Sequence, residues 1–495
     1  MRPKQSVEDS SLHKMATPDF STFRNVIAGS LRSSPTMGQG IDPSTREPLW
    51  DVPIATESDL NDAVTAAQAA FLEWSQLSWK DRQAHLRQIR SLLIQHRPSM
   101  ARLISSEGGK PPQFGDLEVQ HALDFLEFYS GCEEPKPEVV QDDKSLSLTL
   151  YHEPLGVIGA ICPWNYPLVL AVGKIAPALL TGNCIILKPS PFTPYSILKL
   201  VDIVMDTLPA GVLQAIHGDD KLGPALCSHS GIQKITFTGS TATGKKILAS
   251  SGLKNVTLEL GGNNASIVCP DINISEVAPQ VALGAFFNSG QLCVASKRIY
   301  VHEDIYDKLL KAMVDVVKNW KVGPPSLEGV MLGPVQNKMQ YNVVRSIFED
   351  TARNGYKFAL GGDQKPDQNS FLISPAIIDC PPDSSMVVQK EAFGPIVPLM
   401  RWSNEADLIA RVNDTSTGLG GTIWSKDLDY AYRLASKVEA GTIWINSFER
   451  PLPQAYLEGH KESGIGGEWG KHGISSYLKR KMIHHYKSSP PSAKL

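Results

Sequence analysis

The 495-residue sequence lacks several features that would place it in a specialised class of protein. Its 48 lysine and arginine residues nearly balance 51 aspartate and glutamate residues, so no basic excess attracts nucleic acid. The seven cysteines include no C-x-x-C pair, and an odd number without such a pair argues against a disulfide framework or a cysteine-rich zinc site. We therefore expect a reducing compartment, no metal and no nucleic-acid partner.

Long apolar runs are also missing. The first residues are polar and include Glu8 and Asp9, unlike a signal or transit peptide. The most apolar region, residues 155–182, is interrupted by Pro163, Lys174 and Pro177. A membrane span needs about twenty continuous apolar residues, so we expect a core segment here and no membrane association.

The chain is long enough for more than one folded unit, since a domain spans roughly 100–200 residues. Residues 58–74 carry apolar side chains at helical spacing, and SWKD (78–81) resembles a capping box that opens a second helix to residue 93. Beyond residue 156, apolar runs bounded by glycine and proline alternate with helical segments, as in a parallel sheet with crossover helices. Strands are predicted at 156–162, 183–188, 234–239 and 255–260, with helices at 196–208 and 243–250.

A second alternation follows residue 293, with strands at 300–301, 395–401 and 441–446 and a helix at 305–320. We find no internal repeat and no low-complexity tract. The pattern predicts two α/β domains that face each other, and ligands commonly bind in the cleft between such domains.

Four motifs in the first α/β region carry residues suited to chemistry. CPWNYP (162–167) holds Asn165 between prolines, where it is an amide donor or a structural loop residue. LKPSPFTP (187–194) places Lys188 at the end of a strand. Its side chain there either binds the ribose or phosphate of a nucleotide or is simply solvated. FTGSTATGKK (237–246) leads from a strand through a glycine-bounded loop to a helix start, which favours phosphate.

The fourth motif, LELGGNN (258–264), ends a strand with Glu259. A carboxylate there is costly to bury unless it is hydrogen-bonded or partly protonated, so Glu259 is a general-base candidate, with a capping or ion-paired role as the alternative. Downstream, FFNSGQLCVASKR (286–298) contains Cys293. A lone cysteine is usually a buried core residue, but the preceding motifs favour a nucleophile.

In this order the motifs resemble the aldehyde dehydrogenase superfamily, in its NAD(P)-dependent, non-acylating type. The resemblance extends over nearly the whole chain, through EGGKP (107–111), KEAFGP (390–395), GTIWIN (441–446) and KESGIG (461–466). It implies that Cys293 is the nucleophile and Glu259 the general base. Asn165 and the backbone N–H of Cys293 would then stabilise the oxyanion, while Gly290 would leave room for nicotinamide to approach the sulfur.

The resemblance also implies a domain organisation and a cofactor site. A Rossmann-like NAD(P)-binding domain would comprise residues 1–131 and 151–258, and a catalytic domain residues 259–474. A small β extension for homodimers or homotetramers would comprise residues 132–150 and 475–495. NAD, with NADP as the alternative, would contact Trp164, Lys188, Ser190, Gly239, Ser240, Thr243, Gly244, Glu391 and Phe393.

Several positions depart from the family pattern. Pro191 replaces a glutamate that binds the adenosine ribose in many members, which removes one reason to exclude NADP. Ala392 replaces a second acidic residue, and Tyr456-Leu457-Glu458-Gly459 replaces Pro-Phe-Gly-Gly. An apolar or aromatic aldehyde is expected from the predicted substrate pocket, which comprises Tyr166, Val169, Gly173, Leu292, Val294 and Leu457.

Two other functions remain open. A CoA-acylating semialdehyde dehydrogenase shares the fold, although Glu259 argues against it, and a catalytically silent binding protein would not need all of these residues. The final Ala493, Lys494 and Leu495 are close to a peroxisomal address, so we expect an import receptor as a partner and a peroxisomal location, otherwise a cytoplasmic one.

Overall fold

The computed structural model describes residues 18–362, 367 and 369–487. The predicted peroxisomal tripeptide, Ala493, Lys494 and Leu495, lies outside these residues, so its use stays a prediction. Among the described residues, no helix is long and apolar enough to cross a membrane. The same residues contain no group of three or more His, Cys, Asp or Glu side chains that could hold a metal ion.

The first sheet has eight strands in the order β2-β1-β9-β8-β7-β10-β11-β24. Its five central strands, from β9 to β11, run parallel to one another. The strands are β1 (Asn25–Ile27), β2 (Ser30–Arg32), β7 (Val157–Ile161), β8 (Cys184–Lys188), β9 (Leu213–Ala215), β10 (Lys234–Thr238), β11 (Asn255–Glu259) and β24 (Gly464–Ile465).

The chain changes direction within this sheet next to β7. It first adds β8 and β9 on one side of β7, and then adds β10 and β11 on the other side. The loops that follow β7 and β10 therefore diverge at the carboxyl edge of the sheet. Such a switch point opens the crevice in which α/β proteins bind ligands.

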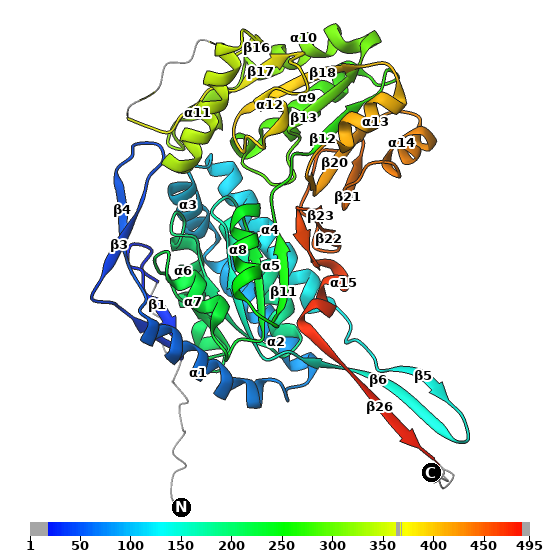
Figure 1. Cartoon of the computed structure of the whole chain (residues 1–495). Helices are drawn as coiled ribbons and strands as arrows, with labels where there is room; N and C mark the ends of the chain where they lie inside the picture. The colour runs from blue at the N-terminus through cyan, green and yellow to red at the C-terminus, as the bar shows by residue number, and fades with distance from the viewer. Residues whose placement is uncertain (1–17, 363–366, 368, 488–495) are drawn as a thin grey trace, which may run out of the picture.

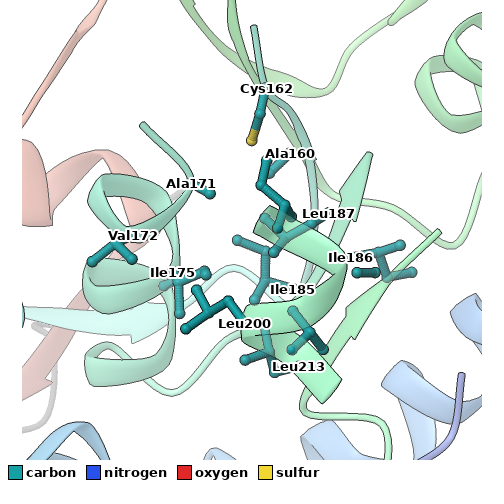
Figure 2. Packing of buried hydrophobic residues seen from close by; sticks show 14 of the residues in the cluster. Ala160, Cys162, Ala171, Val172, Ile175, Ile185, Ile186, Leu187, Leu200 and Leu213 are labelled. Carbon is teal, nitrogen blue, oxygen red and sulfur yellow. The ribbon is translucent and has the colours of Figure 1, made fainter. Parts of the chain in front are cut away.

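Helices cover both faces of the first sheet (Figure 1). Helix α5 is buried on all sides because it packs between the sheet and helices α2 and α4, so its sequence is apolar except for Lys174, which is paired with Glu468. Figure 2 shows Ile175 of α5 and Leu200 of α6 beside Ile185 of β8 in this core. The helices are α1 (Glu57–Trp74), α2 (Trp79–Gln95), α3 (Arg97–Gly108), α4 (Pro112–Gly131), α5 (Pro167–Leu180), α6 (Tyr195–Val204), α7 (Leu222–Ser228) and α8 (Thr241–Ser250).

A second sheet of seven strands has the order β16-β17-β18-β13-β12-β20-β21, with β16 antiparallel and the others parallel. The predicted α/β class is therefore confirmed. Its strands are β12 (Ala265–Val268), β13 (Arg298–His302), β16 (Lys357–Leu360), β17 (Ala376–Asp379), β18 (Ile396–Trp402), β20 (Gly420–Trp424) and β21 (Thr442–Ile445). Its helices are α9 (Ile274–Phe286), α10 (Tyr306–Val317), α11 (Lys338–Arg353), α12 (Met386–Gln389), α13 (Glu405–Asn413) and α14 (Leu428–Ala435).

A three-stranded sheet projects from the body of the molecule (Figure 1). It consists of β5 (Glu138–Asp142), β6 (Leu146–Pro154) and β26 (Leu478–Tyr486), and β26 pairs with β6 along its whole length. Strand β6 extends four residues past the predicted boundary at residue 150. The remaining elements are β3 (Met37–Ile41), β4 (Pro48–Pro53), β14 (Lys321–Val322), β15 (Val330–Leu332), β19 (Thr417–Gly418), β22 (Leu457–Glu458), β23 (His460–Lys461), β25 (Gly467–Glu468) and α15 (Gly470–Ile474).

We call each large sheet with its helices a unit. The chain returns to the first unit, which contains the eight-stranded sheet, before it reaches β26. Strand β24 pairs antiparallel with β11, and Trp469, Ile474 and Tyr477 belong to the first hydrophobic core. The stretch 457–477 therefore packs mainly with the first sheet although it follows the second one in sequence. The functional assignment of residues 259–474 as one catalytic domain stays a prediction.

Candidate active site

The four motifs of the first unit meet at one edge of its sheet. Asn165 follows β7, Lys188 ends β8, Gly239 follows β10 and Glu259 ends β11. Because these strands are parallel neighbours, their carboxyl ends lie side by side. The alternation of strands and helices alone is enough to bring these residues together.

The second unit supplies the facing residues. Cys293 precedes β13, and Glu391 and Phe393 precede β18, its neighbour in the sheet. Two contacts join these segments to the loop after β7. The Asn165 side-chain amide donates to the Gln291 carbonyl at 3.0 Å, and the rings of Trp164 and Phe393 meet edge to face at 5.3 Å.

A cavity of about 660 Å³ lies between the units and contains Asn165, Glu259 and Cys293 in its wall. Most of the other lining side chains are apolar. They are Phe114, Leu117, Tyr166, Val169, Leu170, Leu283, Phe287, Leu292, Val294, Met331, Trp444, Phe448, Pro451, Leu452, Pro453, Leu457 and Trp469. Such a cavity accepts a bulky apolar compound beside three chemically active groups.

Cys293 lies in a turn whose backbone is tightly held. The Asn264 side chain donates to the Cys293 carbonyl at 2.7 Å and to the Ala295 carbonyl at 2.9 Å. Burial, together with the nearby carboxyls of Glu391 and Glu259, raises the pKa of the Cys293 thiol to about 12. Without a further positive charge the sulfur is therefore a thiol at neutral pH, and not yet the strongly nucleophilic thiolate.

Gly290 shapes the approach to Cys293. Its φ of +74° favours glycine, and a Cβ there would lie 2.3 Å from the Gly394 carbonyl oxygen. The absence of a side chain thus lets two loops of the second unit meet. The ammonium group of Lys297 donates to the Gly290 carbonyl and lies 5.3 Å from the centre of the Phe393 ring.

Glu259 is buried, and neither of its carboxyl oxygens has a hydrogen-bond partner. Burial, and to a lesser degree the charge of Glu468, raise its pKa well above the ordinary value. Lys174, which could have neutralised Glu259, instead donates to both oxygens of Glu468 at 2.7 Å. A carboxyl in this state can take a proton from water near neutral pH.

The residues predicted to hold a dinucleotide lie around the switch point. Lys188 and Ser190 are buried at the end of β8, while Ser240 caps α8 by accepting from the Thr243 N–H at 3.3 Å. Glu391 retains one buried oxygen without a partner, and burial raises its pKa to about 7. A helix N-terminus, a buried ammonium group and an unpaired carboxyl oxygen together fit a phosphate and the hydroxyls of a ribose.

Five of the six predicted pocket residues line the cavity: Tyr166, Val169, Leu292, Val294 and Leu457. Gly173 does not. A Cβ at Gly173 would lie 2.9 Å from the indole nitrogen of Trp469, so the Trp469 ring fills the space that the missing side chain leaves. Gly173 is therefore not a pocket residue as predicted, and it affects the cavity only through Trp469, which lines it.

Two other residues of the site, Lys110 and Glu118, were not singled out from the sequence, although Lys110 lies within the EGGKP motif. The ammonium group of Lys110 donates to Glu118 and lies 3.8 Å from the centre of the Tyr166 ring, and Glu118 accepts from the Leu168 N–H at 2.9 Å. Only the fold brings these residues to the start of α5, directly after Asn165. The sequence also did not single out Glu449, which lines the same cavity.

Comparison with known proteins identifies the family. The chain matches the aldehyde dehydrogenase family over residues 32–483. It belongs to that family. The enzyme is accordingly an oxidoreductase that acts on aldehydes, as the order of its motifs predicted.

Individual relatives of this aldehyde dehydrogenase agree with the assignment. The chain is 41% identical to aldehyde dehydrogenase LUC3 of a Fusarium species over 95% of this chain and 100% of that protein. It is 34% identical to the peroxisomal aminoaldehyde dehydrogenase 1 of Pisum sativum, over 91% and 93% of the two chains. The crystal structure of Staphylococcus aureus betaine aldehyde dehydrogenase with NAD+ superimposes with a TM-score of 0.92 at 31% identity, covering 96% and 97%.

Proposed function

We propose that the enzyme oxidises an aldehyde to a carboxylic acid through a covalent intermediate on Cys293, with water activated by Glu259. The observation that carries this proposal is the shared cavity, whose wall contains Cys293, Glu259 and Asn165 and is otherwise mostly apolar. A nucleophile, a base and an amide donor are the three groups that acyl transfer to water requires.

The chain's own residues have distinct tasks in this reaction. The Cys293 sulfur adds to the aldehyde carbon and forms a thiohemiacetal, whose oxyanion the free N–H of the Asn165 amide and the Cys293 backbone N–H would stabilise. Asn165 uses one N–H on the Gln291 carbonyl, so its second N–H is available. Loss of hydride leaves a thioester, and Glu259 then deprotonates the water that hydrolyses it.

We infer that NAD is the hydride acceptor, with NADP as the alternative. The bound nicotinamide group would receive the hydride of the thiohemiacetal. Lys188 and Ser190 would hold the adenosine ribose, residues 239–244 the pyrophosphate, and Glu391 the second ribose beside Phe393. Pro191 offers no carboxylate to repel a 2′-phosphate, so relative kcat/KM with the two cofactors decides between them.

The substrate class follows from the lining of the cavity. About 660 Å³ of mostly apolar space favours an aldehyde with a bulky aliphatic or aromatic body. A short polar aldehyde would leave much of this surface uncovered. We therefore expect kcat/KM to rise with apolar size across a series of aldehydes.

Two substitutions test the covalent pathway. Cys293→Ala should abolish NADH formation with every aldehyde, and retained activity would refute the assignment of the nucleophile. Glu259→Gln should slow hydrolysis of the thioester more than its formation, so mass spectrometry should detect an acyl adduct on Cys293. Release that depends on added CoA, with no hydrolysis, would instead indicate a CoA-acylating enzyme.

A further inference from the structure

Two carboxyl groups in the wall of the cavity have no hydrogen-bond donor. Of the four acidic residues described there, Asp124 accepts from Gln120 at 2.8 Å and Glu468 accepts from Lys174. Neither carboxyl oxygen of Glu259 or Glu449 has a hydrogen-bond partner on another residue. A buried polar group without a hydrogen bond loses its hydration free energy and gains nothing in exchange. A ligand that forms a hydrogen bond with such a group therefore binds more tightly.

The proposed reaction accounts for Glu259 but not for Glu449. The Glu449 side chain follows β21 and is only 4% exposed. A Cβ placed on Gly284 would lie 3.4 Å from Glu449 Oε2, so the carboxyl lies in the space left by this glycine of α9. Leu283 and Phe287 of that same segment line the cavity, which puts Glu449 in an apolar wall.

We propose that Glu449 determines specificity by hydrogen-bonding a neutral polar group, a hydroxyl or an amide, on an otherwise apolar aldehyde. This inference rests on the proposed function. A carboxyl group offers both a donor and an acceptor to such a group, and an apolar wall around it penalises any substrate that leaves it unpaired.

Neighbouring charges argue for a neutral partner over a cationic one. The positive charge of Lys297 lowers the pKa of Glu449, although the Lys297 ammonium group donates its hydrogen bond to the Gly290 carbonyl. The exposed Arg450 guanidinium, also in the cavity wall, lies 4.9 Å from the centre of the Phe448 ring. Burial has the larger, opposite effect and raises the pKa of Glu449 to about 8, so the group is mostly protonated at neutral pH. At Glu449 an incoming ammonium group would meet the positive charges of Lys297 and Arg450 and a carboxyl that carries little negative charge itself.

The test compares aldehydes of equal chain length that end in a methyl, a hydroxyl or an ammonium group. The wild-type enzyme should prefer the hydroxy aldehyde over the alkyl aldehyde by at least about tenfold in kcat/KM. Glu449→Gln should keep this ratio within about threefold because an amide also donates and accepts, whereas Glu449→Met should bring it close to one. Asp315→Asn, which alters a carboxyl of α10 outside the cavity wall that already has donors, is the control and should leave the ratio unchanged.

The ratio within one variant does not depend on how much of that variant folds. If Glu449→Met yields no folded enzyme, the wild-type ratio and Glu449→Gln still decide. Equal kcat/KM for the hydroxy and alkyl aldehydes in the wild-type enzyme would overturn the proposal. So would a preference for the ammonium aldehyde that Glu449→Gln removes. If the wild-type enzyme makes no NADH from any aldehyde, the proposed function fails instead.

Discussion

The ion pair between Lys110 and Glu118 should control both stability and catalysis. Both side chains are almost completely buried, at 2% and 0% exposure, and the pair lies at the start of α5. Lys110 also lies over the Tyr166 ring, and Glu118 accepts a hydrogen bond from the Leu168 N–H. Replacing Lys110 by methionine would leave Glu118 as a buried carboxylate with one backbone donor.

The expected cost can be worked out from these contacts. A hydrogen bond between charged groups contributes about 1.5–3 kcal/mol, and a desolvated cation–π contact contributes about 2 kcal/mol. Lys110→Met should therefore destabilise the first unit by about 4 kcal/mol, within the range for breaking a buried ion pair. Glu118→Gln should cost a similar amount, but the double variant should cost less than either single one, because it leaves no unpaired charge.

Differential scanning calorimetry of the three variants measures this coupling, and steady-state kinetics measures its effect on the site. Asn165 lies three residues before Leu168, the second residue of α5, whose N–H donates to Glu118. A shift of the α5 start should therefore lower kcat between about ten- and a hundredfold. Arg97→Gln and Asp116→Asn, which break a half-exposed pair at 2.7 Å, serve as controls and should cost about 0–1 kcal/mol. Additive losses in the double variant, or unchanged kcat in Lys110→Met, would refute the reasoning.

Three further expectations concern the cofactor site, the nucleophile and assembly. If Glu391 binds ribose hydroxyls as a carboxylate, affinity for NAD should rise as the pH passes upward through about 7, measured by fluorescence titration, and Glu391→Gln should lose that dependence. Gly290→Ala should lower kcat at least tenfold, since its Cβ would meet the Gly394 backbone; stopped-flow kinetics with normal rates would contradict this. Strand β26 carries the exposed apolar side chains Met482, Ile483 and Tyr486, so its removal should convert an oligomer to monomers in analytical ultracentrifugation. A monomeric wild-type enzyme would contradict the expected assembly through β26.

Local patterns predicted much of this molecule. The strands that end at Lys188 and Glu259 are short apolar runs bounded by glycine and proline, and parallel pairing then brings their ends together. Contacts distant in sequence could not be read in this way. Gly173 was misplaced because Trp469, almost 300 residues later, fills the space beside it. Glu449 was missed because a lone glutamate is usually solvated, and only the fold buries it.

The pairing of β24 with β11 affects when the enzyme becomes competent during its synthesis. Glu259 pairs with Gly464, about 200 residues later, and the Leu260 N–H donates to the Ser463 carbonyl at 2.8 Å. Until that later segment has been translated, one edge of β11 stays unpaired, and the end that carries Glu259 is held by β10 alone. Closing so long a loop is slow, so the proposed base Glu259 reaches its final surroundings only when the chain is nearly complete. A partly made chain thus lacks the last contacts of the proposed site.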